Sequence, residues 1–177
     1  NFAVTHSTAK EKFGNTSLKF TDNDYLYMAD HADWDFGNGN FTVDFWLGYP
    51  TDTGVWCEIL SQGWTSGSDS WVIGIDWANN NKIQFAYTTD GSTDVYGGYT
   101  TSTVNTSAWT HYAFVRSGTT LKTYVNGVLE VTHTIGTSTI FSSTKPLYIG
   151  QRETSPTAFD YVGYMDEIRI SKTARWT

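Results

Sequence analysis

Short runs of alternating apolar and polar residues recur along this chain every ten to fifteen residues, with turn residues between them. In one such run, the period of two places Phe41, Val43 and Phe45 on the same face of a predicted strand. The steps Asp90-Gly91 and Asn126-Gly127 are the strongest turn signals, because both residue types tolerate positive φ. No long run has the three-or-four-residue spacing of an amphipathic helix. The pattern therefore predicts an all-β chain of antiparallel strands.

Eleven runs are predicted strands, at residues 18–20, 25–28, 41–47, 56–61, 70–77, 82–88, 110–116, 121–125, 128–135, 145–149 and 164–171. Their number predicts two stacked antiparallel sheets, a jelly-roll β-sandwich with long loops at its rims. A chain of 177 residues with no repeat or low-complexity linker fits one domain over residues 1–177.

Seven stretches of the chain carry a family resemblance. The run from Tyr164 to Ser171 contains Asp-Glu-Ile-Arg-Ile, and six further stretches precede it at residues 13–20, 36–46, 59–63, 109–116, 124–127 and 146–150. In content and order they resemble the laminin-G-like, or concanavalin A-like, jelly-roll family. The resemblance implies that the closing strand pairs with the first one. It does not imply a ligand, because this fold hosts many functions.

The closing strand also suggests a metal site. Asp166 and Glu167 are adjacent carboxylates inside a predicted sheet, where burial is costly unless a cation, backbone donors or a metal ion neutralises them. We expect a structural calcium ion at Asp166, joined by backbone carbonyls and the side chain of Asp22 or Asp24. The turn that contains Asp22 and Asp24 should lie near Asp166, because strand 18–20, which precedes this turn, is expected to pair with the last strand.

Charge limits the partners. Twelve Asp or Glu residues lie between Asp22 and Asp94 against the single base Lys82, and the net charge is −7. These carboxylates are either a solvated face or calcium ligands, and the sequence leaves both readings open. Nucleic acid is excluded as a partner, because binding its phosphates needs a stripe of basic residues and this sequence has none. No apolar run approaches the roughly 20 residues of a membrane span.

The single cysteine, Cys57, forbids an internal disulfide and is expected to be a buried, inert thiol. Animal laminin-G domains often carry a disulfide, so its absence favours a bacterial or viral origin. We expect a domain excised from a longer extracellular, cell-surface or virion protein, whose other domains are candidate partners.

Most aromatic rings are expected in the core, including Trp109, Tyr112, Phe114, Tyr148 and Tyr164. A second group lies in or beside loops rich in Gly, Ser and Asn. A ring held there can stack on a sugar while amides and carboxylates bind its hydroxyls. The sequence therefore predicts a carbohydrate-binding rim made of Trp64, Asp76, Trp77, Asn79, Asp94, Tyr96 and Tyr99. The alternative, in which these rings fold back to cap the edge of the sandwich, stays open.

Signals for catalysis are missing from the sequence. Glycoside hydrolases of related sandwiches place paired carboxylates on a central strand, but no Glu-X-Asp-X-X-Glu run exists here. Closely spaced acids occur only near the ends of the domain, and the four His residues are scattered. We therefore expect a non-enzymatic, lectin-like module that binds a glycan or polysaccharide and holds a structural calcium ion. The alternatives are a protein–protein adhesion or spacer module and, third, a glycoside hydrolase relative.

Overall fold

The structure, a computed structural model, describes residues 3–51, 54–64, 67–152 and 159–176. Among these residues no helix has the length and apolar character that crossing a membrane requires. Thirteen strands make up the regular structure described: β1 (Thr5–Ser7), β2 (Ser17–Phe20), β3 (Leu26–Met28), β4 (Phe41–Gly48), β5 (Trp56–Gln62), β6 (Trp71–Asp76), β7 (Lys82–Thr88), β8 (Asp94–Tyr99), β9 (Trp109–Ser117), β10 (Thr120–Val125), β11 (Val128–Thr134), β12 (Leu147–Ile149) and β13 (Gly163–Ser171).

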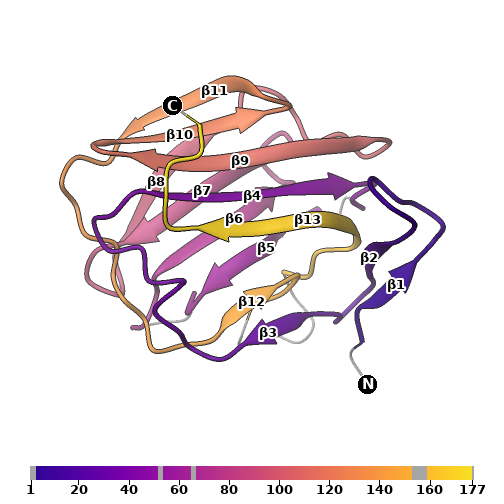
Figure 1. Cartoon of the computed structure of the whole chain (residues 1–177), viewed down its shortest axis with the longest axis horizontal. Coiled ribbons are helices and arrows are strands. Elements are labelled where there is room, and N and C mark those ends of the chain that lie inside the picture. The colour runs from indigo at the N-terminus through magenta and orange to yellow at the C-terminus, as the bar shows by residue number, and fades with distance from the viewer. Residues whose placement is uncertain (1–2, 52–53, 65–66, 153–158, 177) are drawn as a thin grey trace.

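The strands form two antiparallel sheets stacked face to face (Figure 1). The seven-stranded sheet has the order β1-β2-β13-β4-β9-β10-β11, and the six-stranded sheet has the order β3-β12-β5-β6-β7-β8. This confirms the predicted jelly-roll sandwich. The predicted pairing of the first and last strands is also present, because β13 pairs with β2 in antiparallel register.

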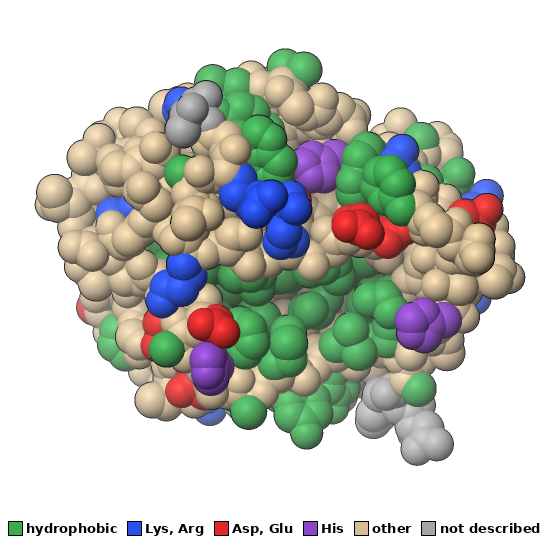
Figure 2. Space-filling view, viewed as in Figure 1, with side chains coloured by type: hydrophobic (Ala, Val, Ile, Leu, Met, Phe, Trp, Pro, Cys, Tyr) green, Lys and Arg blue, Asp and Glu red, His purple; other side chains and the backbone are tan. Residues whose placement is uncertain are grey.

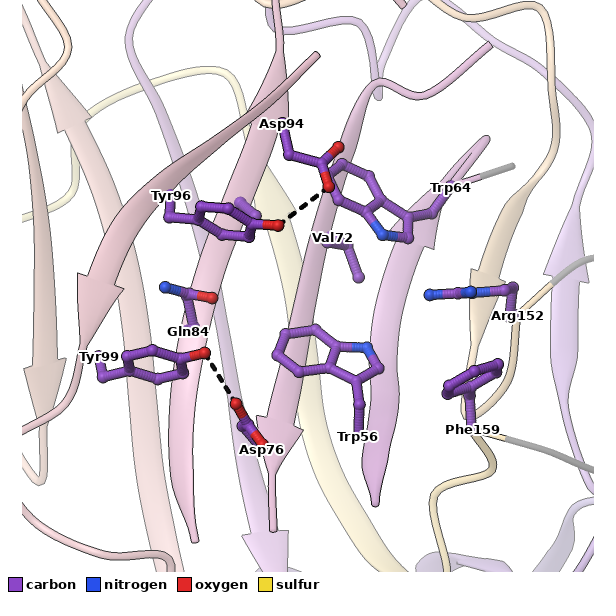
Figure 3. A pocket seen from close by; sticks show the side chains of 11 residues that line it. Trp56, Trp64, Val72, Asp76, Gln84, Asp94, Tyr96, Tyr99, Arg152 and Phe159 are labelled. Atoms are coloured by element: carbon purple, nitrogen blue, oxygen red, sulfur yellow. Dashed lines mark hydrogen bonds between the residues drawn. The ribbon is translucent and has the colours of Figure 1, made fainter. Parts of the chain in front are cut away.

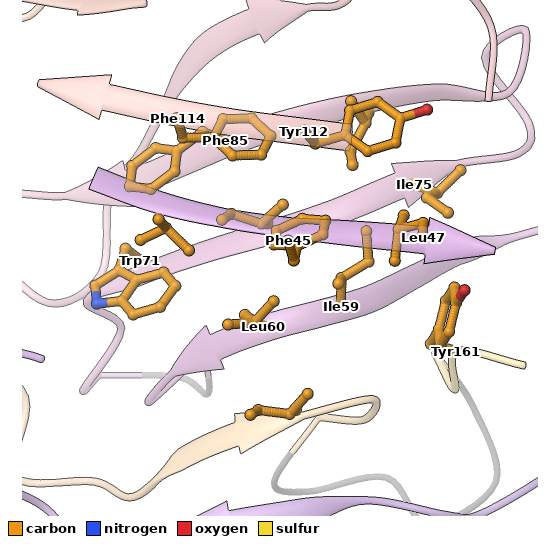
Figure 4. Packing of buried hydrophobic residues seen from close by; sticks show 14 of the residues in the cluster. Phe45, Leu47, Ile59, Leu60, Trp71, Ile75, Phe85, Tyr112, Phe114 and Tyr161 are labelled. Atoms are coloured by element: carbon orange, nitrogen blue, oxygen red, sulfur yellow. The ribbon is translucent and has the colours of Figure 1, made fainter. Parts of the chain in front are cut away.

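The core lies between the sheets because alternate residues of each strand point inward. Phe41, Val43 and Phe45 of β4 are fully buried, as the period of two predicts. From the other sheet, Trp71 and Phe85 stack with ring centroids 6.1 Å apart. Figure 4 shows rings and branched side chains from both sheets filling this layer. Each such side chain contributes about 1.5–3 kcal/mol when it is buried.

The structure differs from the sequence prediction at several points. Residues 5–7 and 94–99 form β1 and β8, although neither was predicted as a strand. β8 could not be recognised from alternation, because it contains Gly97 and Gly98. These glycines lie at a register shift in the pairing of β8 with β7. Tyr148, expected in the core, is only half-buried, and so are Trp109 and Tyr164. Cys57 is buried, and burial raises the pKa of its thiol to about 12, as expected for an inert cysteine.

One buried carboxylate, Asp44, anchors the outer face of the seven-stranded sheet. The Arg169 guanidinium donates to both of its oxygens at 3.0 and 2.7 Å, and Nε2 of His111 lies 3.5 Å away. Burial alone would raise the pKa of Asp44, but the hydrogen bonds from His111 and Arg169 outweigh it and lower this pKa. Figure 2 shows Lys or Arg and His side chains close together on this face.

Candidate functional site: an aromatic cleft on the six-stranded sheet

A cleft of about 340 Å³ lies on the outer face of the six-stranded sheet (Figure 3). Strands β5 to β8 supply its floor and one wall, and the segments after β5 and after β12 supply the rest. Its lining combines aromatic rings with a few polar groups, an arrangement typical of small-molecule sites. The lining residues are Trp56, Trp64, Val72, Asp76, Gln84, Ala86, Asp94, Tyr96, Tyr99, Arg152 and Phe159.

Strand register explains why these side chains converge. Val72 pairs with Ala86 and Ala86 with Tyr96, so the three lie in one row on the outer face. Val72 and Ala86 are buried, yet neither belongs to the inner core cluster. Their small side chains therefore form a low floor between taller rings.

Trp56 shapes the centre of the cleft. It starts β5, and its indole lies over Gly74 of β6. A Cβ at position 74 would lie only 2.6 Å from Cε2 of the ring. Position 74 therefore accepts only glycine while the ring keeps this place. One face of the half-buried indole therefore rests on β6, and its other face is directed toward the cleft.

Gln84 provides an unsatisfied acceptor in the floor. It pairs directly with Gly74 in the same cross-strand row, on the neighbouring strand β7, and is 2% exposed. Its side-chain Oε1 has no hydrogen-bond partner in the described part of the chain. Figure 3 shows the amide between Tyr96 and Tyr99. A buried acceptor without a partner costs free energy, so its position in a cleft points to a ligand or water donor.

Two tyrosines on β8 form the wall, and each is held by a carboxylate. The hydroxyl of Tyr99 donates to Asp76 at 2.8 Å, and that of Tyr96 donates to Asp94 at 3.1 Å. Burial, followed by the neighbouring carboxylate, raises the pKa of both tyrosines. Both rings therefore stay neutral at physiological pH and keep fixed orientations, and their carboxylate partners retain free acceptor capacity.

An ion pair closes the opposite side. Arg152 Nε donates to Oε1 of the fully buried Glu58 at 2.6 Å. Burial raises the pKa of Glu58, against the opposing effect of the Arg152 charge. The guanidinium also lies 4.1 Å from the ring centroid of Phe159. Arg152 is thereby held with its charge compensated, so this side of the cleft carries no net charge.

The structure brings together five of the seven residues of the predicted carbohydrate rim: Trp64, Asp76, Asp94, Tyr96 and Tyr99. The prediction for Trp77 is wrong, because this ring is 5% exposed and packs in the core between the sheets. Asn79 is exposed in the turn after β6, where its backbone N–H donates to Asp76, and it does not line the cleft.

The predicted rim did not include the residues that line the floor and the far wall: Trp56, Val72, Gln84, Ala86, Arg152 and Phe159. Alternation gave a usable signal for three of them. Val72, Gln84 and Trp56 each come directly before a core residue of the same strand: Ile73, Phe85 and Cys57. Because neighbours in a strand face opposite sides of the sheet, the three should face outward. Nothing in the local sequence indicates that Arg152 and Phe159 meet this face.

The predicted metal set is not assembled. Met165 pairs with Leu18, and Gly163 pairs with Phe20, so the acidic turn that follows Phe20 lies at the opposite end of β2 from Asp166. Four strand residues separate the two places, roughly 13 Å. The proposed cluster of Asp166 with Asp22 or Asp24 is therefore wrong.

Other partners satisfy these carboxylates. Backbone N–H groups of Lys12, Phe13 and Glu167 donate to Asp166 at 3.3, 3.0 and 2.9 Å. Asp24 accepts from the backbone N–H and hydroxyl of Thr21 at 2.8 and 2.6 Å. Within the residues that the structure describes, no group of three or more His, Cys, Asp or Glu side chains could hold a metal ion.

Several solved structures share this fold. Domain 4 of a GH43 extracellular arabinanase from Geobacillus stearothermophilus, in complex with arabinotriose, aligns with a TM-score of 0.69 at 19% identity, covering 97% of this chain and 76% of that chain. The binding domain of Paraclostridial Mosquitocidal Protein 1 aligns with a TM-score of 0.72 at 13% identity, covering 97% of this chain and 42% of that one. Carbohydrate-binding module CBM66 from Bacillus subtilis aligns with a TM-score of 0.54 at 11% identity, covering 96% and 92%.

At these identities the likeness shows the fold alone. No relative was found among curated protein sequences. The family model of the concanavalin A-like lectin/glucanases superfamily matches residues 20–176. The resemblance inferred from the sequence motifs is thus confirmed, and the chain belongs to the concanavalin A-like lectin/glucanases superfamily.

Proposed function

We propose that this domain binds carbohydrate, without chemical conversion, in the cleft on its six-stranded sheet. The observation that carries the proposal is the indole of Trp56, which rests on Gly74 beside the unpartnered amide oxygen of Gln84. A flat ring next to a buried acceptor matches the two surfaces of a sugar, whose C–H face is apolar and whose edge carries hydroxyl donors.

The wall of the cleft adds further partners. Tyr96 and Tyr99 present rings of fixed orientation, and the carboxylates that hold them can accept sugar hydroxyls through their remaining lone pairs. Among the described residues that line the cleft, the only cation is Arg152, which is paired with Glu58. The cleft therefore carries two uncompensated carboxylates, Asp76 and Asp94, and it favours neutral sugars over anionic ones.

The comparisons support this proposal at the level of fold. One similar structure is an arabinanase domain in complex with arabinotriose, and another is a carbohydrate-binding module. The arabinanase is described as extracellular, and we accordingly propose a secreted or cell-surface location for this chain. Arabinan is the first ligand to test.

The carboxylates of the cleft are poorly placed for hydrolysis. Asp76 pairs with Lys82 and Asp94 pairs with Thr88, so six residues of β7, roughly 20 Å, separate their rows. Glycosidase pairs lie roughly 5–10 Å apart. Glu58 lies in a nearer row but is fully buried and bound to Arg152. These positions support a binding role and argue against the hydrolase alternative.

A protein–protein adhesion or spacer module would present a flat apolar patch rather than a cleft with polar partners. The amide oxygen of Gln84, which has no partner among the described residues, favours sugar binding over this alternative.

A binding screen on arabinan, xylan and laminarin tests the proposal. The protein and its Trp56→Ala variant are compared by isothermal titration, and Phe13→Ala serves as the control because Phe13 is exposed and packs on Trp46 of the seven-stranded sheet. We expect Trp56→Ala to weaken binding by about 1–3 kcal/mol and Phe13→Ala to leave it unchanged. Equal affinity of all three proteins would place the site elsewhere.

A further inference from the structure

A second aromatic cluster lies on the outer face of the same sheet, outside the cleft. Tyr27 and Tyr148 stack with ring centroids 6.1 Å apart at an interplanar angle of 28°, and Tyr25 lies 5.7 Å from Tyr148. Tyr27 is 63% exposed. The neighbours of Tyr148 in β12, Leu147 and Ile149, belong to the core, which directs Tyr148 outward.

Strand register connects this cluster with the cleft. Tyr27 pairs with Tyr148, and Tyr148 pairs with Ser61 of β5. Ser61 pairs with Val72, which continues the row through β7 to β8. A single cross-strand row therefore crosses all six strands of the sheet: Tyr27, Tyr148, Ser61, Val72, Ala86 and Tyr96.

This row has tyrosines toward both ends and small, buried side chains between them. Ser61, Val72 and Ala86 are at most 2% exposed, whereas Tyr27 lies on the outermost strand β3, Tyr148 on the adjacent strand β12 and Tyr96 on the outermost strand β8. Five strand spacings of about 4.8 Å give a length of about 24 Å between Tyr27 and Tyr96. A single sugar cannot reach both ends, but an oligosaccharide chain can.

We propose that the cleft and the tyrosine cluster are two subsites of one platform, which binds the interior of an extended polysaccharide lying across the strands. This inference rests on the function proposed above. Because the row ends at both edges of the sheet, a bound chain can continue past either end, so the platform does not require a chain terminus.

Length dependence is the measurable consequence. A ligand that reaches only the cleft gains nothing from Tyr27, whereas a ligand that spans both subsites engages the second one at high effective concentration. Affinity should therefore rise with chain length, and Tyr27 should matter only for long chains.

Titration calorimetry with oligosaccharides of three and eight residues tests this inference. They are prepared from whichever of arabinan, xylan and laminarin binds most tightly. We expect the octamer to bind the protein more tightly than the trimer does. Tyr27→Ala should weaken octamer binding roughly two- to tenfold and leave trimer binding unchanged. Trp56→Ala should weaken both, and Phe13→Ala neither.

The outcomes separate the two proposals. If Trp56→Ala weakens binding but the octamer binds no better than the trimer, or if Tyr27→Ala leaves octamer affinity intact, the extended platform is overturned and the cleft stands. If no polysaccharide binds the unmodified protein, the proposed function itself fails, and the platform with it.

Discussion

The indole of Trp56 lies across Gly74 of the neighbouring strand, and the space that a Cβ would occupy is filled by the ring. Gly74 of β6, which has no side chain, thus makes the space in which the ring of Trp56 of β5 lies. This relationship holds one face of the ring against the sheet and explains why the centre of the cleft is flat.

Replacing Gly74 with Ala should disturb both stability and binding. The new methyl group would lie 2.6 Å from Cε2 of Trp56 and 2.7 Å from the carbonyl oxygen of Cys57, so the ring has to move. We expect a loss of about 1–3 kcal/mol in the free energy of unfolding and weakened polysaccharide binding. Urea denaturation and calorimetry measure these effects. Gly39→Ala is the control, because its Cβ would meet only the carbonyl oxygen of Phe36, at 3.3 Å.

Gln84→Met should separate stability from binding. The substitution removes a buried acceptor that has no partner among the described residues, so the free energy of unfolding should stay unchanged or rise by about 1 kcal/mol. Polysaccharide affinity should fall, because a hydroxyl donor of the sugar loses its acceptor. Thermal melting and calorimetry measure the two effects. A variant that is destabilised yet binds normally would show that Gln84 serves only the fold.

The sequence predicted the sandwich well because alternation and turn chemistry are local properties. Phe41, Val43 and Phe45 faced inward as their spacing required. Trp77 was misplaced because its position next to a turn was given more weight than alternation. It continues the period-two series of Trp71, Ile73 and Ile75, which are all buried in the core. Arg152 could not be found in advance, because its position depends on a long-range pair with Glu58, 94 residues away in the chain.

The ligand set predicted for the metal ion failed for a related reason. Pairing of the first and last strands was predicted correctly, but their register was not, and register decides which end of β2 approaches Asp166.

Arg169→Met should destabilise the domain by about 3 kcal/mol at pH 7, because it leaves the buried Asp44 carboxylate without its main partner. The folded state lowers the pKa of Asp44, so its contribution to stability is present above the unfolded pKa of about 3.9 and is lost as pH falls through the folded pKa. The difference between variant and wild type should therefore shrink below about pH 4. Urea denaturation at several pH values measures it, with the exposed Arg175→Met as the control.

Calcium binding stays a prediction, now without the ligand set first assigned to it. If the folded domain binds the ion, a hundredfold excess over Kd stabilises it by about 2.7 kcal/mol. We expect a higher melting temperature in calcium than in EDTA. Identical melting curves would show that the acidic residues are a solvated face.

If sugar binds on the six-stranded sheet, the indole N–H signals of the eight tryptophans should show which rings it approaches. They are assigned by single Trp→Phe variants and followed by two-dimensional NMR while arabinan, xylan or laminarin oligosaccharides are added. We predict that the signals of Trp56 and Trp64 shift and that those of Trp46 and Trp176, which contact His111 on the other sheet, do not. Shifts at Trp46 and Trp176 with the Trp56 signal unmoved would place sugar binding on the seven-stranded sheet and overturn the proposed site.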